Sequence, residues 1–226
     1  MRKFCVLPCL LLAAALLAQT PAPQPKADEY TQEPYVVELV STVARFEKDG
    51  TGRREQTMRV AIKTDLGVEQ WGQLVFGYNS GNEKLEVPYV RVRKADGAVV
   101  TAGADAIQDL TPSVTRDAPM YTDYREKHVT VPALRPGDML EYSIVTATHT
   151  ALAAGQFWWD YDFEDRAIVL DEQVEVNVPK DRQFTLKTQP GYDPKISEEN
   201  GRKIYRWQSS HLKRKTDEEL RAEAKK

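Results

Sequence analysis

The strongest constraint on the fold is a series of short segments rich in β-branched and aromatic residues, in which apolar and polar positions alternate. In residues 54–64, for example, Met58, Val60 and Ile62 fall on one face. Successive side chains of a strand point to opposite faces, so this period of two predicts strands. The predicted strands cover residues 35–47, 54–64, 73–78, 84–93, 124–131, 139–148, 156–164, 171–178, 184–188 and 203–208.

Turn residues separate these segments, and no helical apolar pattern is sustained between them. The turns are Asp49-Gly50, Asp96-Gly97, Arg135-Pro136-Gly137-Asp138 and Asn200-Gly201. Glycine supplies the positive φ that tight hairpins need, and proline sets φ at the start of a turn. Residues 65–72 predict a short helix or loop, and residues 101–123 a long connection. The pattern predicts an all-β fold, an antiparallel two-sheet β-sandwich of immunoglobulin-like architecture.

The first residues predict export. Arg2 and Lys3 precede an apolar run over residues 4–17, and Pro21 soon follows it. This layout is typical of a signal peptide, and the run is shorter than the roughly 20 residues that span a bilayer. We therefore expect a signal peptide at residues 1–18 and a periplasmic or secreted mature chain without a transmembrane segment.

The rest of the chain divides into three parts by composition. Residues 19–33 are polar and proline-bearing, which predicts a tether. Residues 34–208 hold the predicted sandwich. Residues 209–226 are highly charged and predict a helical tail or a truncated linker. The sequence leaves open whether the chain stands alone or belongs to a longer protein.

Cysteine content and net charge exclude some functions. The two cysteines, Cys5 and Cys9, both lie in the predicted signal peptide. The mature chain is therefore expected to have no disulfide, and no thiol for nucleophilic or metal chemistry. The formal net charge of −3 argues against a nucleic-acid partner, because such proteins are usually strongly basic.

The histidines and acids do not form a recognisable site. The histidines, which lack metal-ligand spacing and accompany no Gly-x-Ser-x-Gly motif, are His128, His149 and His211. Asp160, Asp162 and Glu164 are spaced like the start of a calcium loop, but the sixth position is Asp165 where that loop has glycine. The acids are better explained as the solvated face of a strand. We expect no catalytic residue, metal site or cofactor, and hence no enzyme.

Trp158 is the one candidate ligand-binding residue. By alternation Phe157 and Trp159 face the core, whereas Trp158 shares the polar face with Asp160 and Asp162. An exposed tryptophan beside carboxylates is suited to stacking against a sugar ring. In the alternative interpretation a loop, such as residues 101–123, folds over Trp158 and buries it.

Several motifs together resemble a known family. They are Asp96-Gly97 after residues 89–93, the segment 134–142 (LRPGDMLEY), Phe157-Trp158-Trp159, and Val176-Asn177-Val178-Pro179 leading to residues 201–207. Their order resembles a bacterial domain of unknown function that commonly precedes transglutaminase-like domains in exported proteins. The resemblance covers residues 34–208 and implies a β-sandwich with no assigned activity. The Cys-His-Asp constellation of a transglutaminase-like enzyme is missing, because no cysteine follows Cys9.

Three functions remain open at this stage. The leading hypothesis is a non-catalytic exported accessory or interaction domain that positions a partner such as a transglutaminase-like enzyme. The alternative is a carbohydrate- or peptidoglycan-binding module that uses Trp158. A self-contained hydrolase is the third hypothesis and has the least support in the sequence.

Overall fold

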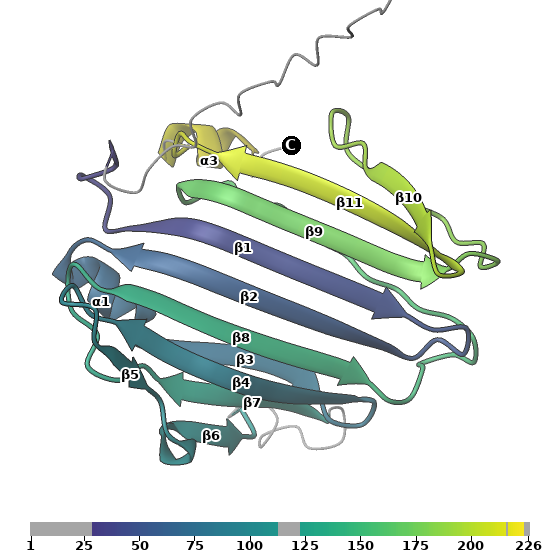
Figure 1. The fold of residues 1–226 in the computed structure, drawn as a ribbon, viewed down its shortest axis with the longest axis horizontal. Coiled ribbons are helices and arrows are strands. Elements are labelled where there is room, and N and C mark those ends of the chain that lie inside the picture. The colour runs from purple at the N-terminus through teal and green to yellow at the C-terminus, as the bar shows by residue number, and fades with distance from the viewer. Residues whose placement is uncertain (1–28, 113–122, 216, 224–226) are drawn as a thin grey trace, which may run out of the picture.

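The computed structural model describes residues 29–112, 123–215 and 217–223. The predicted signal peptide (1–18) and most of the predicted tether (19–33) lie outside these ranges. The fold is mostly β and has two sheets (Figure 1). The strands are β1 (Tyr35–Phe46), β2 (Gly52–Ile62), β3 (Gln73–Asn79), β4 (Glu83–Arg93), β5 (Val99–Thr101), β6 (Ile107–Leu110), β7 (Tyr124–Thr130), β8 (Met139–Thr148), β9 (Val169–Pro179), β10 (Lys195–Glu199) and β11 (Arg202–His211).

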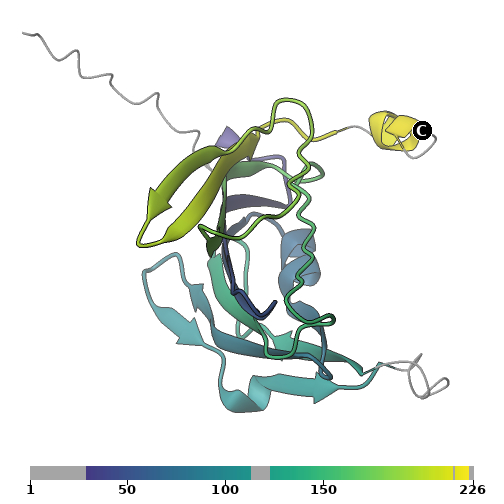
Figure 2. The same cartoon turned by 90° about the vertical axis from the view of Figure 1, so that its right-hand side faces the viewer.

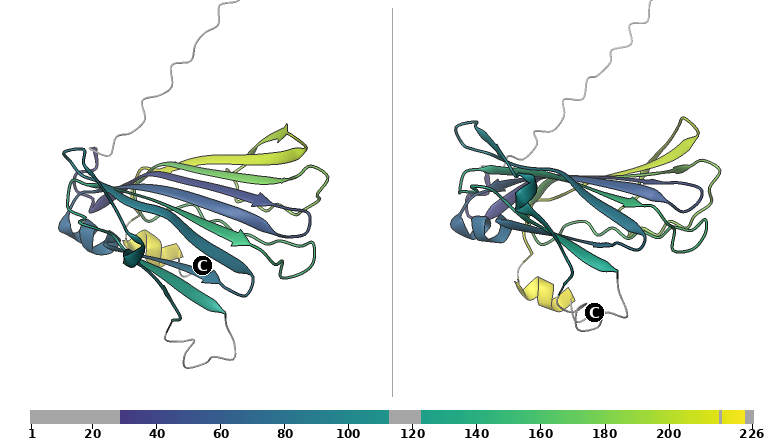
Figure 3. Two further views of the ribbon diagram at one scale, coloured as in Figure 1. Left: turned by 60° about the horizontal axis from the view of Figure 1, so that its bottom comes forward. Right: turned by 90° about the horizontal axis from the view of Figure 1, so that it is seen from below.

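The larger sheet has eight strands in the order β10-β11-β9-β1-β2-β8-β4-β5, and the smaller has three in the order β3-β7-β6. The smaller sheet diverges from one end of the larger (Figure 3). Three strands were not expected from the sequence: β5 and β10 at the two edges of the larger sheet, and β6 in the smaller sheet. β5 ends at the start of the predicted connection 101–123 and β6 lies within it; residues 113–122 of this connection lie outside the described ranges. The finer prediction of an immunoglobulin-like sandwich is not confirmed and stays a prediction.

The expectation of purely antiparallel pairing is wrong at one place. β1 pairs in parallel with β9, whereas it pairs antiparallel with β2, and β2 pairs antiparallel with β8. β8 and β9 therefore run in the same direction, so the chain must return along the whole sheet between them. Such parallel connections are usually made by a helix. Here an extended segment crosses one face of the sheet instead (Figure 2).

This returning segment, residues 156–166, is called the strap below. The sequence predicted a strand at 156–164 and another at 184–188, and both predictions are wrong, because neither stretch pairs with a strand. The alternation is real nonetheless, since Phe157, Trp159 and Tyr161 are turned inward while their neighbours are exposed. The strap lies over a sheet face, so one side is buried although no strand lies beside it.

The turns and the short helix follow the sequence closely. Gly50 has a φ of +88° in the β1–β2 turn, as the Asp-Gly pair predicts. Helix α1 (Asp65–Trp71) begins after Thr64, whose hydroxyl accepts a hydrogen bond from the Gly67 amide at 3.4 Å. A Cβ atom on Gly67 would lie 2.2 Å from the Pro34 carbonyl oxygen, so only glycine allows this close approach.

The core has two main parts. One lies between the two sheets and is built from fully buried side chains such as Val60, Val129 and Leu140. The other lies under the strap, where Phe46, Val176 and Tyr205 pack against the inward rings of the strap. The second part is the one that positions the candidate site.

The C-terminal region differs slightly from its predicted bounds. β11 continues to His211, three residues beyond the predicted end of the sandwich at 208. The predicted charged helix is present as α3 (Asp217–Glu223), and a 3-10 helix (Ala104–Ala106) precedes β6. Among the described residues, no helix is long and apolar enough to cross a membrane.

Candidate functional site

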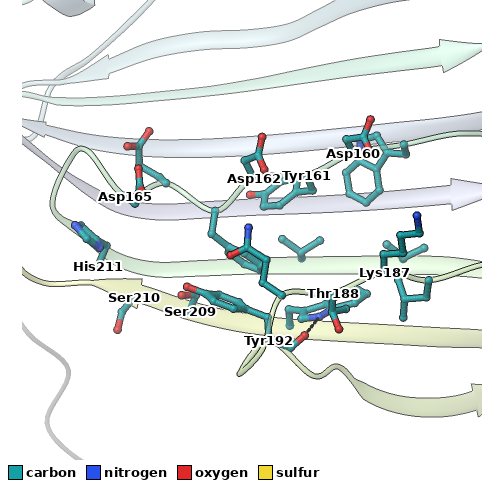
Figure 4. A pocket seen from close by; sticks show the side chains of 18 of the residues that line it. Asp160, Tyr161, Asp162, Asp165, Lys187, Thr188, Tyr192, Ser209, Ser210 and His211 are labelled. Atoms are coloured by element: carbon teal, nitrogen blue, oxygen red, sulfur yellow. Dashed lines mark hydrogen bonds between the residues drawn. The ribbon is translucent and has the colours of Figure 1, made fainter. Parts of the chain in front are cut away.

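The candidate site is a groove of about 820 Å³ on the strap-covered face of the larger sheet. One wall is the strap, the opposite wall is formed by residues 186–189 and 192, and the floor comes from β9 and β11 (Figure 4). The floor includes Val174, Val176 and Trp207. Aromatic rings and carboxylates thus line one concavity, which is an arrangement typical of binding surfaces.

Ring packing holds the strap on the sheet. Phe157 stacks on Phe46 with the ring centroids 4.1 Å apart and the planes at 7°. Tyr161 contacts both Trp159 and Phe163, at centroid distances of 5.5 and 5.3 Å. Aromatic pairs contribute about 0.5–1.5 kcal/mol beyond the area they bury. The strap therefore has a fixed position although it belongs to no sheet.

A ring contact also links the two walls. Phe163 of the strap stacks on Tyr192 with a centroid distance of 4.9 Å, and the Tyr192 carbonyl oxygen accepts a hydrogen bond from the Trp207 indole at 2.9 Å. Tyr192 is thereby fixed between the strap and β11, and it defines one end of the opposite wall.

A buried glutamate fixes the strap from below. Glu172 of β9 is only 3% exposed. The Tyr161 hydroxyl donates to its Oε1 at 2.6 Å, and the Glu164 amide donates to its Oε2 at 3.1 Å. Burial raises the pKa of the Glu172 carboxyl, and burial together with the Glu172 charge raises the pKa of Tyr161. Sequence reasoning missed Glu172, because a glutamate in a strand is usually assigned to the solvated face.

Trp158 lies where alternation places it. Trp158 is 65% exposed, so none of the described residues buries it; residues 113–122 of the loop named in the alternative lie outside the described ranges. Trp158 does not line the groove, whereas Asp160 and Asp162 do. These carboxylates have no ion-pair partner among the described residues. The candidate tryptophan and the groove therefore share the strap but are distinct surfaces.

One end of the groove collects residue types that a hydrolase uses. Asp165, Ser209, Ser210 and His211 all line it. Asp165 is bound to Lys215, and this hydrogen bond lowers the pKa of the carboxyl. The buried Nε2 atom of His211 has no hydrogen-bond partner among the described residues. Ser210 and His211 are consecutive in a strand, so their side chains diverge (Figure 4). No hydrogen bond joins these groups into a triad of the kind that acyl transfer needs.

The remaining histidines lie elsewhere. His128 is in β7, where it bonds Glu126 at 2.9 Å, and His149 follows β8 and bonds Thr150. Within residues 29–112, 123–215 and 217–223, no group of three or more histidine, cysteine, aspartate or glutamate side chains is arranged to hold a metal ion.

The segment 134–142, the most specific of the family motifs, has a structural role. Asp138 is buried, accepts a hydrogen bond from the Arg135 amide at 2.8 Å, and is paired with Lys94. Lys94 also donates to the Ala133 carbonyl oxygen at 2.7 Å. The Gly137 amide donates to the Ile62 carbonyl oxygen at 2.8 Å. The motif thus ties the β7–β8 connection to β2 and β4, away from the groove.

The fold and groove define a class: a mostly β domain in which an aromatic strap and the sheet beneath it form an acidic and aromatic concavity. The chain belongs to the family of domains of unknown function DUF3857, which it matches over residues 48–216. No curated protein matches the sequence.

Several solved structures are similar to the chain, and the first of those that follow shares its fold. The first is a protein of Parabacteroides distasonis that is described as a proposed protease. It has a TM-score of 0.71 and 18% identity, and the match covers 81% of this chain and 37% of that protein. The M1 zinc metallopeptidase of Deinococcus radiodurans has a TM-score of 0.41 and 13% identity, over 78% of this chain and 39% of its own. Aminopeptidase A of Legionella pneumophila has a TM-score of 0.41 and 9% identity, over 83% of this chain and 21% of its own. This chain therefore spans well under half the length of each.

Proposed function

We propose that the chain is an exported, non-catalytic accessory domain that uses the groove to hold a polypeptide partner for an enzyme, such as a transglutaminase-like one. The observation that carries the proposal is the groove itself, whose wall is held on the sheet by the Phe46–Phe157 stack and by buried Glu172 beneath the strap. Among its polar groups, Asp165 is tied to Lys215, Asp160 and Asp162 are exposed, and the buried Nε2 atom of His211 has no hydrogen-bond partner among the described residues.

The size of the related structure supports an accessory role. The fold makes up 37% of the longer Parabacteroides distasonis protein, which is described as a proposed protease. Domains that accompany a catalytic unit commonly bind or orient its substrate, and their surfaces then carry the recognition residues on a rigid scaffold. A signal peptide at residues 1–18 would take the domain to the periplasm or outside the cell.

The proposal predicts binding without turnover. The full chain is incubated with glutamine-bearing peptides and an amine donor, with peptidoglycan fragments, and with common glycans, and the products are followed by mass spectrometry. We expect products to form no faster than in a control reaction without the protein. Turnover that survives purification and disappears in Asp160→Asn, Glu164→Gln or His211→Ala would contradict the non-catalytic assignment and favour a hydrolase.

A second candidate function, glycan or peptidoglycan binding, rests on the exposure of Trp158. We expect Trp158→Ala to change the free energy of unfolding by no more than about 0.5 kcal/mol, because little of the ring is buried. Trp159→Ala is the matched control, and it should cost about 2–3 kcal/mol, since Trp159 packs against Phe46 and Tyr161.

The measurement combines thermal unfolding with co-sedimentation on insoluble peptidoglycan and chitin. If the glycan function holds, the wild-type chain sediments with one of them and Trp158→Ala stays in solution with an unchanged melting temperature. Equal retention of the two proteins, or no retention of the wild type, would contradict this second function.

A further inference from the structure

Two extended segments face the groove with free main-chain groups. Among the described residues, the backbone N–H and C=O groups of residues 157–163 and 183–188 make no hydrogen bond to the rest of the chain. Backbone N–H and C=O groups are strong donors and acceptors, and nearly all buried ones pair with other protein groups or with water. Both segments are extended, so these groups are presented in the spacing of a strand edge.

The geometry of the strap determines where its main-chain N–H and C=O groups point. The strap turns its odd-numbered rings onto the sheet and its even-numbered side chains to solvent, from Phe157 to Phe163. In an extended chain the N–H and C=O groups point at right angles to the side chains. Those of the strap therefore point along the sheet surface rather than into it. The groove separates residues 157–163 from residues 186–188, so a stretch of unpaired extended chain lies on each side of it.

The acidic side chains of the strap favour a positively charged ligand in the groove. Asp160 and Asp162 stand on its solvent side and line the groove without an ion-pair partner in the described residues (Figure 4). Glu164 and Asp165 are already bonded, to the Arg166 amide and to Lys215 respectively. A strand added beside the strap would place alternate side chains next to Asp160 and Asp162. Opposite charges in such cross-strand positions are favourable.

We propose that the groove binds an extended polypeptide segment with basic residues at alternate positions, which adds as a strand beside the strap. Strand addition of this kind takes its affinity from main-chain hydrogen bonds and its specificity from alternate side chains. The inference rests on the proposed accessory function and gives that function a partner class and a binding mode.

The direct test uses a blocked heptapeptide, acetyl-Thr-Lys-Thr-Lys-Thr-Lys-Thr-amide, and the full chain, with titration calorimetry at low salt. We expect the peptide with glutamate in place of lysine to bind at least about tenfold more weakly. The variant Asp160→Asn/Asp162→Asn should weaken the lysine peptide about fivefold. The control Glu69→Gln/Asp105→Asn removes two exposed acids elsewhere and should leave the affinity unchanged.

Main-chain pairing is tested separately from charge attraction. Two further peptides carry N-methyl groups on alternate residues, one on the odd and one on the even positions, which blocks the donors of one edge at unchanged charge. At least one of them should lose binding about tenfold or more. Hydrogen exchange followed by mass spectrometry should slow in residues 157–163, in residues 183–188, or in both, when the unmethylated peptide is bound.

The outcomes separate the inference from the proposed function. If both methylated peptides bound as tightly as the unmethylated peptide, or if exchange in the two segments stayed unchanged, the binding would be a diffuse charge attraction and strand addition would be overturned. No binding of the lysine peptide would also overturn it. In each of these cases the accessory function stands, provided that mass spectrometry shows no turnover. Cleavage or cross-linking of the peptide would instead overturn the non-catalytic function itself.

Discussion

Replacing Phe46 by alanine is expected to lower the free energy of unfolding by about 3–5 kcal/mol, the range for large buried aromatic truncations. Phe46 is 5% exposed and lies under Phe157 and Trp159. Because the strap has no strand pairing, the loss of this ring removes a main contact between the strap and the sheet. The free energy is measured by urea unfolding followed by circular dichroism.

The same variant should also expose the strap before the whole domain unfolds. Limited proteolysis is expected to cleave Phe46→Ala within residues 156–166 under conditions that leave the wild type intact. Phe46→Leu keeps most of the volume and should cost under about 1.5 kcal/mol. Val43→Ala changes an exposed side chain on the same strand and should cost no more than about 0.5 kcal/mol. A cost for Phe46→Ala as small as that of Val43→Ala would refute this account of the strap.

Glu172→Ala has the second largest expected effect. The substitution leaves the Tyr161 hydroxyl and the Glu164 amide without their acceptor. Each unsatisfied buried group costs about 1–3 kcal/mol, so we expect a total near 3 kcal/mol and a Tm lower by roughly 10 °C. Glu172→Gln is the matched control, because its amide can accept from Glu164 and donate to Tyr161.

The glutamine variant also gives a pH test. The pKa of Glu172 is raised above its ordinary value near 4.5, chiefly by burial. A raised carboxyl pKa means that the folded state holds the proton more tightly than the unfolded state. The contribution of Glu172 to stability is therefore full below pH 4.5 and is lost as the pH rises through the folded-state pKa.

Glutamine does not titrate, so the stability of Glu172→Gln relative to the wild type should rise between pH 4 and pH 7. Thermal unfolding of both proteins at several pH values measures this difference, and carboxyls common to both proteins cancel. A difference that stays constant, or that falls with pH, would show that burial does not dominate the pKa of Glu172.

The candidate site shows why prediction from the sequence succeeded only in part. Alternation correctly placed Trp158 outside and Phe157 inside, because one face of the strap is buried whatever covers it. The same alternation wrongly predicted a strand at 156–164. A period of two indicates that one side of an extended segment is buried, but it does not indicate whether another strand is hydrogen-bonded beside that segment. Glu172 could not be found, since its burial depends on Tyr161 and Glu164 being brought over it by the strap.

Local sequence by itself determined most of the strands, the short helix α1 and the tight turns, because each depends on side-chain alternation, capping or glycine conformation within a few residues. The parallel β1–β9 pair, the unequal sheets and the groove were decided only by the tertiary structure. The physical reason is that β8 and β9 run in the same direction on either side of β1 and β2. The chain between them must therefore cross the sheet face, and this crossing buries Glu172 and leaves the main chain of residues 157–163 without hydrogen bonds among the described residues.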